Sequence, residues 1–283
     1  MLDIFKKAKQ DKYAIGQFNV SNMEQLKAVV QSAEKLQSPI IIGTSEGESK
    51  FFGKRQIVAL VKAWRLETDL PIILHLDHGK SFEIIEEAIG AGYDSIHFDG
   101  SELSFQENIE KTKKIVDLAR EKGIKNIEGE LGYLRGKSSI QEEVEIREED
   151  LTNIEQALEF LEKTGVDSLA IVIGNVHGIF KSSQNPRLHI DRLEGIKNKI
   201  GDKANLVLHG GSGISEEDIK EAISFGIVKI NVNTELRIAY ANTLKKSLEF
   251  GETTPYKIMA PVVEAVQKVV EDKIKLFGSN NKI

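Results

Sequence analysis

Histidine is the residue type in this sequence best suited to do chemistry. Four of the six histidines lie at or near the end of a short apolar run: His75, His78, His177 and His209. The chain has no cysteine, so imidazole and carboxylate groups are the side chains left to bind a metal ion. Three imidazoles from separate strands can fill three corners of a tetrahedron and leave the fourth open, as at a catalytic zinc. The alternative is a set of unrelated polar residues near loops.

Asp77 strengthens the metal hypothesis, because it directly precedes His78 in the segment His-Leu-Asp-His-Gly. A carboxylate there can exchange a proton with an oxygen of a substrate held at the metal. It could instead orient a histidine through a hydrogen bond. We expect His75, two residues earlier on the same strand face, to be a hydrogen-bonded core residue rather than a ligand.

A glycine-rich turn offers a place for phosphate. Residues 210–213 read Gly-Gly-Ser-Gly and precede a helix start at Ser215, so their backbone N–H groups could form an anion cradle. The alternative is a tight loop that needs positive φ. Polar side chains that could complete the cradle are Lys181, Asn231, Asn233 and Thr234.

Acidic residues also occur within the apolar runs. Glu128 and Glu130 alternate along one run and therefore point to the same side, and Asp99 lies at the end of another. Buried carboxylates need partners, which a cation could supply. An ion pair with Lys229 is the competing explanation.

The elements that must position these residues alternate between two kinds. Short apolar runs that read as buried strands are separated by segments of helical period. The runs are 14–20, 39–45, 71–79, 95–100, 126–132, 168–174, 205–211 and 228–234. Eight such β–α units predict an α/β fold, a closed (β/α)8 TIM barrel, with catalytic residues at the carboxyl ends of the strands.

Three further segments complete this organisation. The acidic helix start at Ser215, and Gly123 and Gly226 at expected helix ends, agree with the division into units. Residues 133–150 and 175–187 are long polar loops, which are typical of lids or binding loops. An additional C-terminal helix, about 255–276, is expected to cap the barrel or to pack on a partner.

Composition limits the classes of function. The chain has 283 residues, with 38 Lys plus Arg, 44 Asp plus Glu and a net charge of −6, so nothing favours a nucleic-acid partner. It has no run of about 18 apolar residues that could cross a membrane, and its first residues lack the apolar core of a signal peptide. No Pro-, Gly- or Ser-rich linker divides it. We therefore expect a single domain over residues 1–283 and a cytoplasmic location.

Four segments resemble, in order, the signature segments of the class II, metal-dependent ketose-bisphosphate aldolases, which include fructose-1,6-bisphosphate and tagatose-1,6-bisphosphate aldolases. They are 75–79 (His-Leu-Asp-His-Gly), 176–181 (Val-His-Gly-Ile-Phe-Lys), 208–213 (Leu-His-Gly-Gly-Ser-Gly) and 229–237 (Lys-Ile-Asn-Val-Asn-Thr-Glu-Leu-Arg). Supporting segments are 17–20, 45–47, 98–101 and 128–132. The resemblance therefore covers the whole chain.

The resemblance implies a role for each matching residue. His78, His177 and His209 match the ligands of a catalytic Zn²⁺. Asp77 matches the acid/base that exchanges a proton with the C4 oxygen of the substrate. The residues that match acids binding a second divalent ion, or the first ion in an alternative position, are Asp99 and Glu130. The residues that match the substrate-binding set are Asn19, Ser45, Gly178, Lys181, Gly210, Gly211, Ser212, Asn231, Asn233, Thr234 and Arg237.

The resemblance also implies further ions and partners. Backbone carbonyls near Gly178 and Gly210 match a site for a monovalent cation, Na⁺ or K⁺. Arg237 matches a residue that reaches the second phosphate from a neighbouring subunit, which implies a homodimer or homotetramer. The C3 proton is moved in the family by a glutamate on the loop after strand five. That loop departs here from the common Gly-Gly-Gln-Glu-Asp pattern, which leaves Glu142 and Glu143 as the candidates.

The expected activity is zinc-dependent, reversible cleavage of fructose 1,6-bisphosphate to dihydroxyacetone phosphate and glyceraldehyde 3-phosphate. Tagatose 1,6-bisphosphate is the alternative substrate, because Asn233 stands where fructose-cleaving members have Asp and tagatose-cleaving members have Ala; Arg237 follows the fructose pattern. More distant alternatives are a metal-dependent sugar-phosphate epimerase or isomerase, and a non-catalytic aldolase-associated subunit, which would be expected to lose the histidines kept here. Lys229 leaves a Schiff-base mechanism open.

Overall fold

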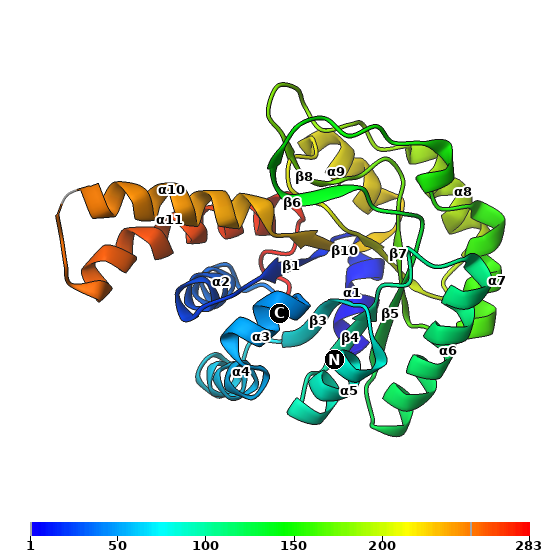
Figure 1. The fold of residues 1–283 in the computed structure, drawn as a ribbon, viewed down its shortest axis with the longest axis horizontal. Coiled ribbons are helices and arrows are strands. Elements are labelled where there is room, and N and C mark those ends of the chain that lie inside the picture. Colours follow the sequence, from blue (N-terminus) through cyan, green and yellow to red (C-terminus); the bar gives the residue numbers. More distant parts are fainter. Residues whose placement is uncertain (1, 250) are drawn as a thin grey trace.

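Parallel strands form the centre of the molecule. The computed structural model describes residues 2–249 and 251–283, and within them eight parallel strands close into a barrel in the order β1, β2, β3, β4, β5, β7, β9, β10 (Figure 1). The strands are β1 (Ile15–Asn19), β2 (Ile40–Thr44), β3 (Ile72–Gly79), β4 (Ser95–Phe98), β5 (Asn126–Leu131), β7 (Ser168–Ile171), β9 (Asn205–Leu208) and β10 (Ile227–Val232). Each overlaps a run expected from the sequence, so the barrel prediction is confirmed.

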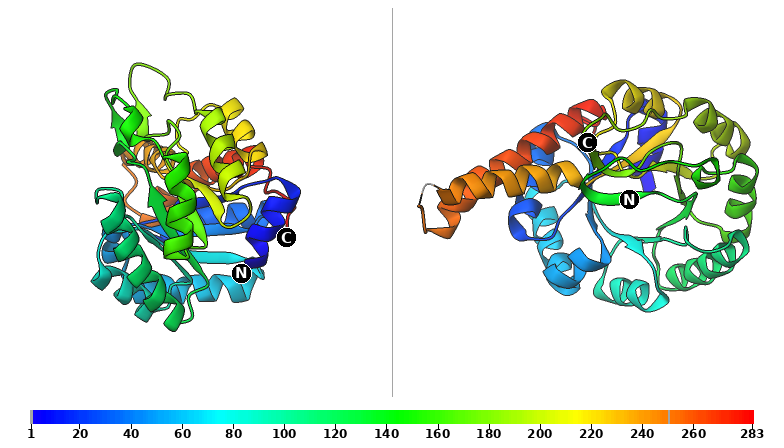
Figure 2. Two further views of the ribbon diagram at one scale, coloured as in Figure 1. Left: turned by 90° about the vertical axis from the view of Figure 1, so that its right-hand side faces the viewer. Right: turned by 45° about the horizontal axis from the view of Figure 1, so that its top comes forward.

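Helices join the strands and cover the outside of the barrel (Figure 2). They are α2 (Met23–Leu36), α3 (Glu46–Phe52), α4 (Lys54–Thr68), α5 (Phe82–Ala91), α6 (Phe105–Glu121), α7 (Ile154–Thr164), α8 (Ile190–Ile200) and α9 (Glu216–Ser224), with a 3-10 turn at Glu148–Asp150. The expected helix start is confirmed, because the Ser215 hydroxyl accepts a hydrogen bond from the Asp218 N–H at 3.1 Å. Apolar side chains of strands and helices pack into a continuous core between the two layers.

Helix α1 (Leu2–Asp11) covers the end of the barrel where the strands begin. Its Phe5 and Ala8 pack in a buried cluster with residues that include Ile15, Ile41 and Val228. This helix is not among the elements expected from the sequence. Because apolar side chains fill this end, polar chemistry must collect at the opposite end, where the strands finish.

The two long polar loops pair with each other at that opposite end. Strand β6 (Gly136–Gln141) and strand β8 (His177–Phe180) form a separate two-stranded parallel sheet. Arg135 anchors this region, because its guanidinium donates to the buried Asp150 carboxylate, with Nη2 to Oδ1 at 2.8 Å. The loops are therefore ordered and lie over the mouth of the barrel.

The chain ends in a helical hairpin that extends away from the barrel (Figure 1). Helix α10 (Thr234–Glu249) packs along α11 (Pro255–Leu276), and α11 also packs on α2. Val266, Val270 and Ile274 of α11 belong to the buried core. The expected C-terminal helix is thus confirmed. Within the described residues, no helix combines the length and apolar character needed to cross a lipid bilayer.

Candidate active site

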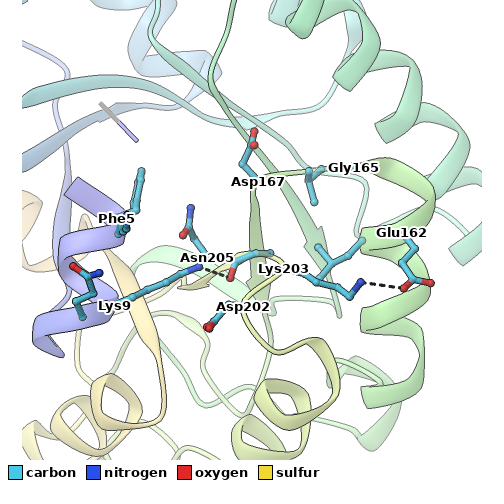
Figure 3. A pocket seen from close by; sticks show the side chains of 13 residues that line it. Phe5, Lys9, Glu162, Gly165, Asp167, Asp202, Lys203 and Asn205 are labelled. Carbon is cyan, nitrogen blue, oxygen red and sulfur yellow. Dashed lines mark hydrogen bonds and ion pairs between the residues drawn. The ribbon is translucent and has the colours of Figure 1, made fainter. Parts of the chain in front are cut away.

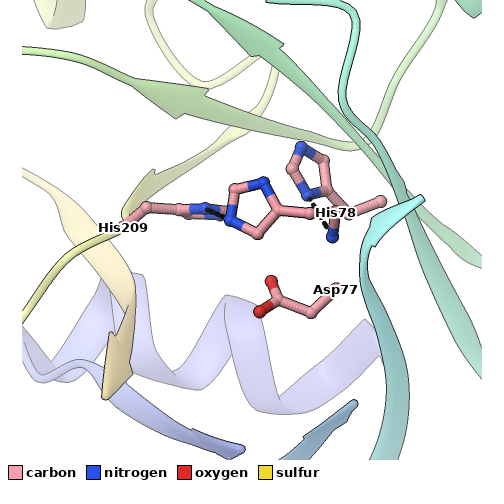
Figure 4. A group of neighbouring side chains, drawn as sticks. Asp77, His78 and His209 are labelled. Atoms are coloured by element: carbon pink, nitrogen blue, oxygen red, sulfur yellow. Dashed lines mark hydrogen bonds between the residues drawn. The ribbon is translucent and has the colours of Figure 1, made fainter. Parts of the chain in front are cut away.

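Imidazole rings from different strands meet at the C-terminal mouth of the barrel. The ring centroid of His78, on β3, lies 4.7 Å from that of His209 and 5.1 Å from that of His177. Figure 4 views His78 and His209 with Asp77 beside them. His97, on β4, lies 4.9 Å from both His78 and His209. Histidines that are far apart in the sequence therefore form one cluster.

The backbone of β3 bends to aim His78 into this cluster. His78 has a φ of +51°, a left-handed conformation that costs a non-glycine residue roughly 1–3 kcal/mol and persists where the surroundings hold it. The pairing of β3 with β4 shifts register between Leu76 and Gly79. The His78 N–H then donates to Nδ1 of His97 at 3.1 Å.

A buried carboxylate fixes the orientation of His209. Its Nε2 lies 2.8 Å from Oε1 of Glu128, whose Oε2 accepts from Nζ of Lys229 at 2.7 Å. With the proton on Nε2, the Nδ1 lone pair faces Nε2 of His78, 3.0 Å away. Burial and the neighbouring His78 lower the pKa of His209 well below its ordinary value, so the ring stays neutral, as a metal ligand must.

Carboxylates surround His78. Asp99 Oδ2 lies 3.0 Å, and Glu130 Oε2 lies 3.7 Å, from its Nδ1. Burial opposes a charge on this ring, but Asp77, Asp99 and Glu130 outweigh burial and raise the pKa of His78 to about 10. Such a concentration of acids stabilises a positive charge at this point.

The donor atoms fit a divalent metal ion. The ligand atoms of Asp77, His78, His97 and His209 all lie within 4.8 Å of one another, and those of His78, Asp99 and Glu130 form a second such group. The 3.0 Å between the facing nitrogens of His78 and His209 is close to the ~3.3 Å edge of a tetrahedron with zinc–nitrogen bonds of ~2.05 Å. His177 lies beside His78 but outside both groups.

Asp77 is buried between two amides. Its Oδ2 accepts from Asn19 Nδ2 at 2.8 Å and its Oδ1 accepts from Asn231 Nδ2 at 3.0 Å. Burial disfavours the charge, but the positive neighbours of Asp77, His78 foremost among them, outweigh burial and hold the pKa of Asp77 below its ordinary range. The carboxylate is therefore ionised and held in one orientation.

A pocket of about 280 Å³ opens beside this cluster. It contains nine of the residues expected to bind substrate, together with Asp77, His78, Ser138 and His177. The nine are Asn19, Ser45, Gly178, Gly210, Ser212, Asn231, Asn233, Thr234 and Arg237. Of the two remaining expected residues, Gly211 is buried within the turn, and Lys181 is exposed and pairs with Glu142 at 2.7 Å.

The glycine-rich turn lies at the pocket, but part of its backbone is already bonded. The N–H of Gly211 donates to the Asn231 carbonyl at 2.8 Å, and the N–H of Gly213 donates to Glu235 Oε1 at 2.9 Å. Glycine is required at 210, because φ is +66° and an added Cβ would lie 2.2 Å from the Val176 carbonyl oxygen. A phosphate cradle would therefore use the other N–H groups of the turn.

Arg237 lines the pocket of its own chain, where Glu48 accepts from Arg237 Nη2 at 2.6 Å. Its expected reach to the second phosphate of a neighbouring subunit stays a prediction. Glu142 and Glu143 are exposed and are absent from the described lining of the pocket. Both follow β6, whose Ser138 lines the pocket.

Other outcomes concern buried polar residues. His75 is a core residue as expected, with Nδ1 2.7 Å from Ser95 Oγ. Glu128 forms the ion pair with Lys229, which was the alternative explanation for this buried acid. His97 and Glu48 were not singled out from the sequence. His97 alternates with Asp99 on one strand face, which could have revealed it, and Glu48 completes a Ser45–Glu48 capping box.

A larger hollow, about 830 Å³, lies at the opposite end of the barrel between α1, α7 and the start of β9 (Figure 3). Several of its charged groups already have partners: Lys9 Nζ donates to the Ala204 carbonyl at 3.0 Å, and Lys203 pairs with Glu162 at 3.4 Å. It lacks the histidine cluster, so the smaller pocket at the mouth is the candidate active site.

Comparisons with known proteins agree with this assignment. The family described as "Fructose-bisphosphate aldolase class-II" matches residues 1–282. The chain is 39% identical to the fructose-bisphosphate aldolase of Thermus caldophilus, over 98% of this chain and 97% of the relative. It is 40% identical to the probable fructose-bisphosphate aldolase of Bacillus subtilis, over 100% and 98%. The structure of the YdjI aldolase of Escherichia coli K12 is 36% identical, with a TM-score of 0.85 over 99% of this chain and 97% of that one.

Proposed function

Because this chain belongs to the class II fructose-bisphosphate aldolase family, a family of metal-dependent lyases, we propose that it cleaves fructose 1,6-bisphosphate reversibly to dihydroxyacetone phosphate and glyceraldehyde 3-phosphate. One observation carries the proposal. The neutral ring of His209, the ring of His78 and the ionised carboxylate of Asp77 converge on a pocket that is bordered by a glycine-rich turn. The curated relatives named above support the choice of fructose bisphosphate.

In this proposal His78, His177 and His209 hold a Zn²⁺ ion. When bound, the ion would act as a Lewis acid that polarises the substrate carbonyl and offsets the negative charge left when the carbon–carbon bond breaks. Glu128 would keep His209 in the tautomer that leaves Nδ1 free. Asp99 and Glu130, which lie next to His78, would bind a second divalent ion or the first ion in an alternative position.

Asp77 would take the proton from the C4 hydroxyl during cleavage and return it during condensation. Its two oxygens are held by Asn19 and Asn231, so the carboxylate needs no rearrangement before it accepts a proton. A buried, preoriented base of this kind is effective because its geometry is fixed before substrate arrives.

The phosphate of the dihydroxyacetone half would bind at the turn of residues 210–213, with Ser212 and Thr234 beside it. Carbonyl groups near Gly178 and Gly210 would hold a monovalent cation, Na⁺ or K⁺. Glu142 and Glu143 remain the candidates for the proton at C3, and their loop would have to move inward to reach the pocket. We also propose a homodimer or homotetramer in the cytoplasm.

Lys229 is unsuited to form a Schiff base in this arrangement. Its Nζ is fully buried and donates to Glu128 at 2.7 Å, and a protonated amine in an ion pair has no free lone pair for attack on a carbonyl.

Product analysis tests the proposal. The purified protein, incubated with fructose 1,6-bisphosphate, should release both triose phosphates. Exhaustive chelation should abolish release, zinc or cobalt should restore it, and borohydride with substrate should trap no adduct. A new hexulose phosphate without trioses would indicate an epimerase or isomerase instead. Activity that survives chelation but is lost to borohydride would indicate the lysine route, and faster cleavage of tagatose 1,6-bisphosphate would correct the sugar.

A further inference from the structure

Glu48 lies behind the wall of the pocket and joins several residues of that wall. It is on α3, with 7% of its surface exposed. Resting on the proposed function, we infer that Glu48 is a positioning residue for the aldehyde half of the substrate. It presents the carbonyl oxygen of Asn233 as the acceptor for a sugar hydroxyl and holds Arg237 at the open end of the pocket.

The carboxylate of Glu48 accepts four hydrogen bonds. Oε2 accepts from the Ser45 N–H at 2.8 Å and from Asn19 Nδ2 at 3.0 Å. Oε1 accepts from Arg237 Nη2 at 2.6 Å and from Asn233 Nδ2 at 3.1 Å. A carboxylate has about four lone-pair directions, so Glu48 is saturated. All four donors belong to residues that line the pocket.

The bond to Glu48 decides which end of the Asn233 amide is available. Because Nδ2 donates to Glu48, Oδ1 is the polar atom left for a ligand. That oxygen is buried and has no hydrogen-bond partner among the described residues, and the same holds for Oδ1 of Asn231, whose Nδ2 donates to Asp77. A buried acceptor without a hydrogen-bond partner destabilises the unliganded protein. Two such acceptors in one pocket therefore suit a ligand rich in hydroxyl donors, such as a sugar chain.

The contact also accounts for an amide at position 233. A carboxylate there would face Oε1 of Glu48 across the 3.1 Å that now separates Asn233 Nδ2 from it, and two like charges at that distance repel strongly. With Glu48 fixed, Asn233 supplies a neutral acceptor in the place where an acid would be repelled. Glu48 and Asn233 therefore form one acid–amide pair.

Exchange of the two functional groups tests this pairing. We expect Glu48→Gln and Asn233→Asp each to lower kcat/KM for fructose 1,6-bisphosphate about 10-fold or more, as expected when a buried polar partner is lost. The double variant should recover most of that loss, because it only exchanges carboxylate and amide between the two positions and conserves their total charge. Losses that simply multiply in the double variant would overturn the inference.

Glu107→Gln is the matched control. Glu107 completes a second Ser-x-x-Glu capping box, with Ser104 at the start of α6, on the exposed surface. Its variant makes the same change in the same type of helix cap, outside the lining of the pocket, and should keep kcat/KM unchanged. An equal loss of kcat/KM in Glu107→Gln would mean that capping, rather than positioning, explains Glu48.

Crystal structures of the wild type and Glu48→Gln separate this inference from the proposed function. We expect the Asn233 amide and the Arg237 guanidinium to leave their wild-type positions when Glu48 is replaced. If both keep those positions, Glu48 does not position them, whatever the enzyme cleaves. If the wild type releases no triose phosphates, the proposed function fails, and the structures still decide the role of Glu48.

Discussion

The buried pair of Lys229 and Glu128 gives the strongest stability prediction. Both side chains are fully buried, and they are 2.7 Å apart inside the barrel. Lys229→Met removes the cation and leaves a buried carboxylate whose remaining partner is the His209 ring. Breaking a buried pair on one side costs about 3–5 kcal/mol. We therefore expect a marked loss of stability despite the similar size of methionine.

The expected fall in melting temperature follows from the size of the chain. Unfolding entropy of about 2.1 cal/mol/K per residue gives roughly 0.6 kcal/mol/K for a chain of this length. A loss of about 3–5 kcal/mol then lowers the melting temperature by about 5–8 °C. The measurement is thermal unfolding followed by circular dichroism on metal-free protein, because bound metal would stabilise the folded state.

A double variant makes the reasoning refutable. Lys229→Met with Glu128→Gln leaves no unpaired charge, and the glutamine oxygen can still accept from His209. It should melt within about 3 °C of wild type, since replacing both members of a buried pair is often nearly neutral. A single variant as stable as wild type, or a double variant no better than the single, would show that the pair is not the cause.

Other expected outcomes concern the metal, the base and the loop. His209→Ala should lose bound zinc, measured by elemental analysis. Asp77→Ala should keep zinc and lose turnover at least about 100-fold, as expected when a general base is removed. Normal turnover of Asp77→Ala would rule out proton transfer by Asp77. Arg135→Ala should speed proteolytic cleavage within residues 133–150, because it removes the partner of Asp150. Burial raises the pKa of Asp150, but the Arg135 guanidinium outweighs burial and lowers it. The pair therefore stabilises the loop above pH ~4, and the difference between variant and wild type should shrink below that pH. Equal proteolysis rates at neutral pH would contradict the anchoring role.

The barrel could be predicted because its strands are short, apolar and separated by turn residues. The expected and observed boundaries of the strands differ by a few residues at most. The last strand, for example, is expected at 228–234 and observed as Ile227–Val232. Helix α1 and the pairing of β6 with β8 could not be predicted from the sequence. The first forms to cover apolar strand ends that exist only in the closed barrel, and the second joins loops that become neighbours only after closure.

The candidate site shows the same division. His78 lies at the end of β3, His209 directly follows β9, and His177 lies in the segment after β7. The carboxyl ends of barrel strands meet at one mouth, so the proximity of the three rings follows from topology. His97 lies inside its strand, and its sequence environment resembles that of His75. The stagger between β3 and β4, with its register shift before Gly79, decides that His97 joins the cluster. In the sequence, Glu48 is fully explained as part of a helix cap. Its contacts with Asn233 and Arg237 therefore cannot be predicted from the sequence.

The pairing of β6 with β8 has a mechanical consequence. His177 is the first residue of β8, and its N–H donates to the Arg135 carbonyl at 2.8 Å, just before β6 begins. Strand β6 and the backbone of His177 are therefore coupled by the pairing of the two strands. Any displacement of β6 would also move the His177 ring relative to His78 and His209, which belong to the barrel wall.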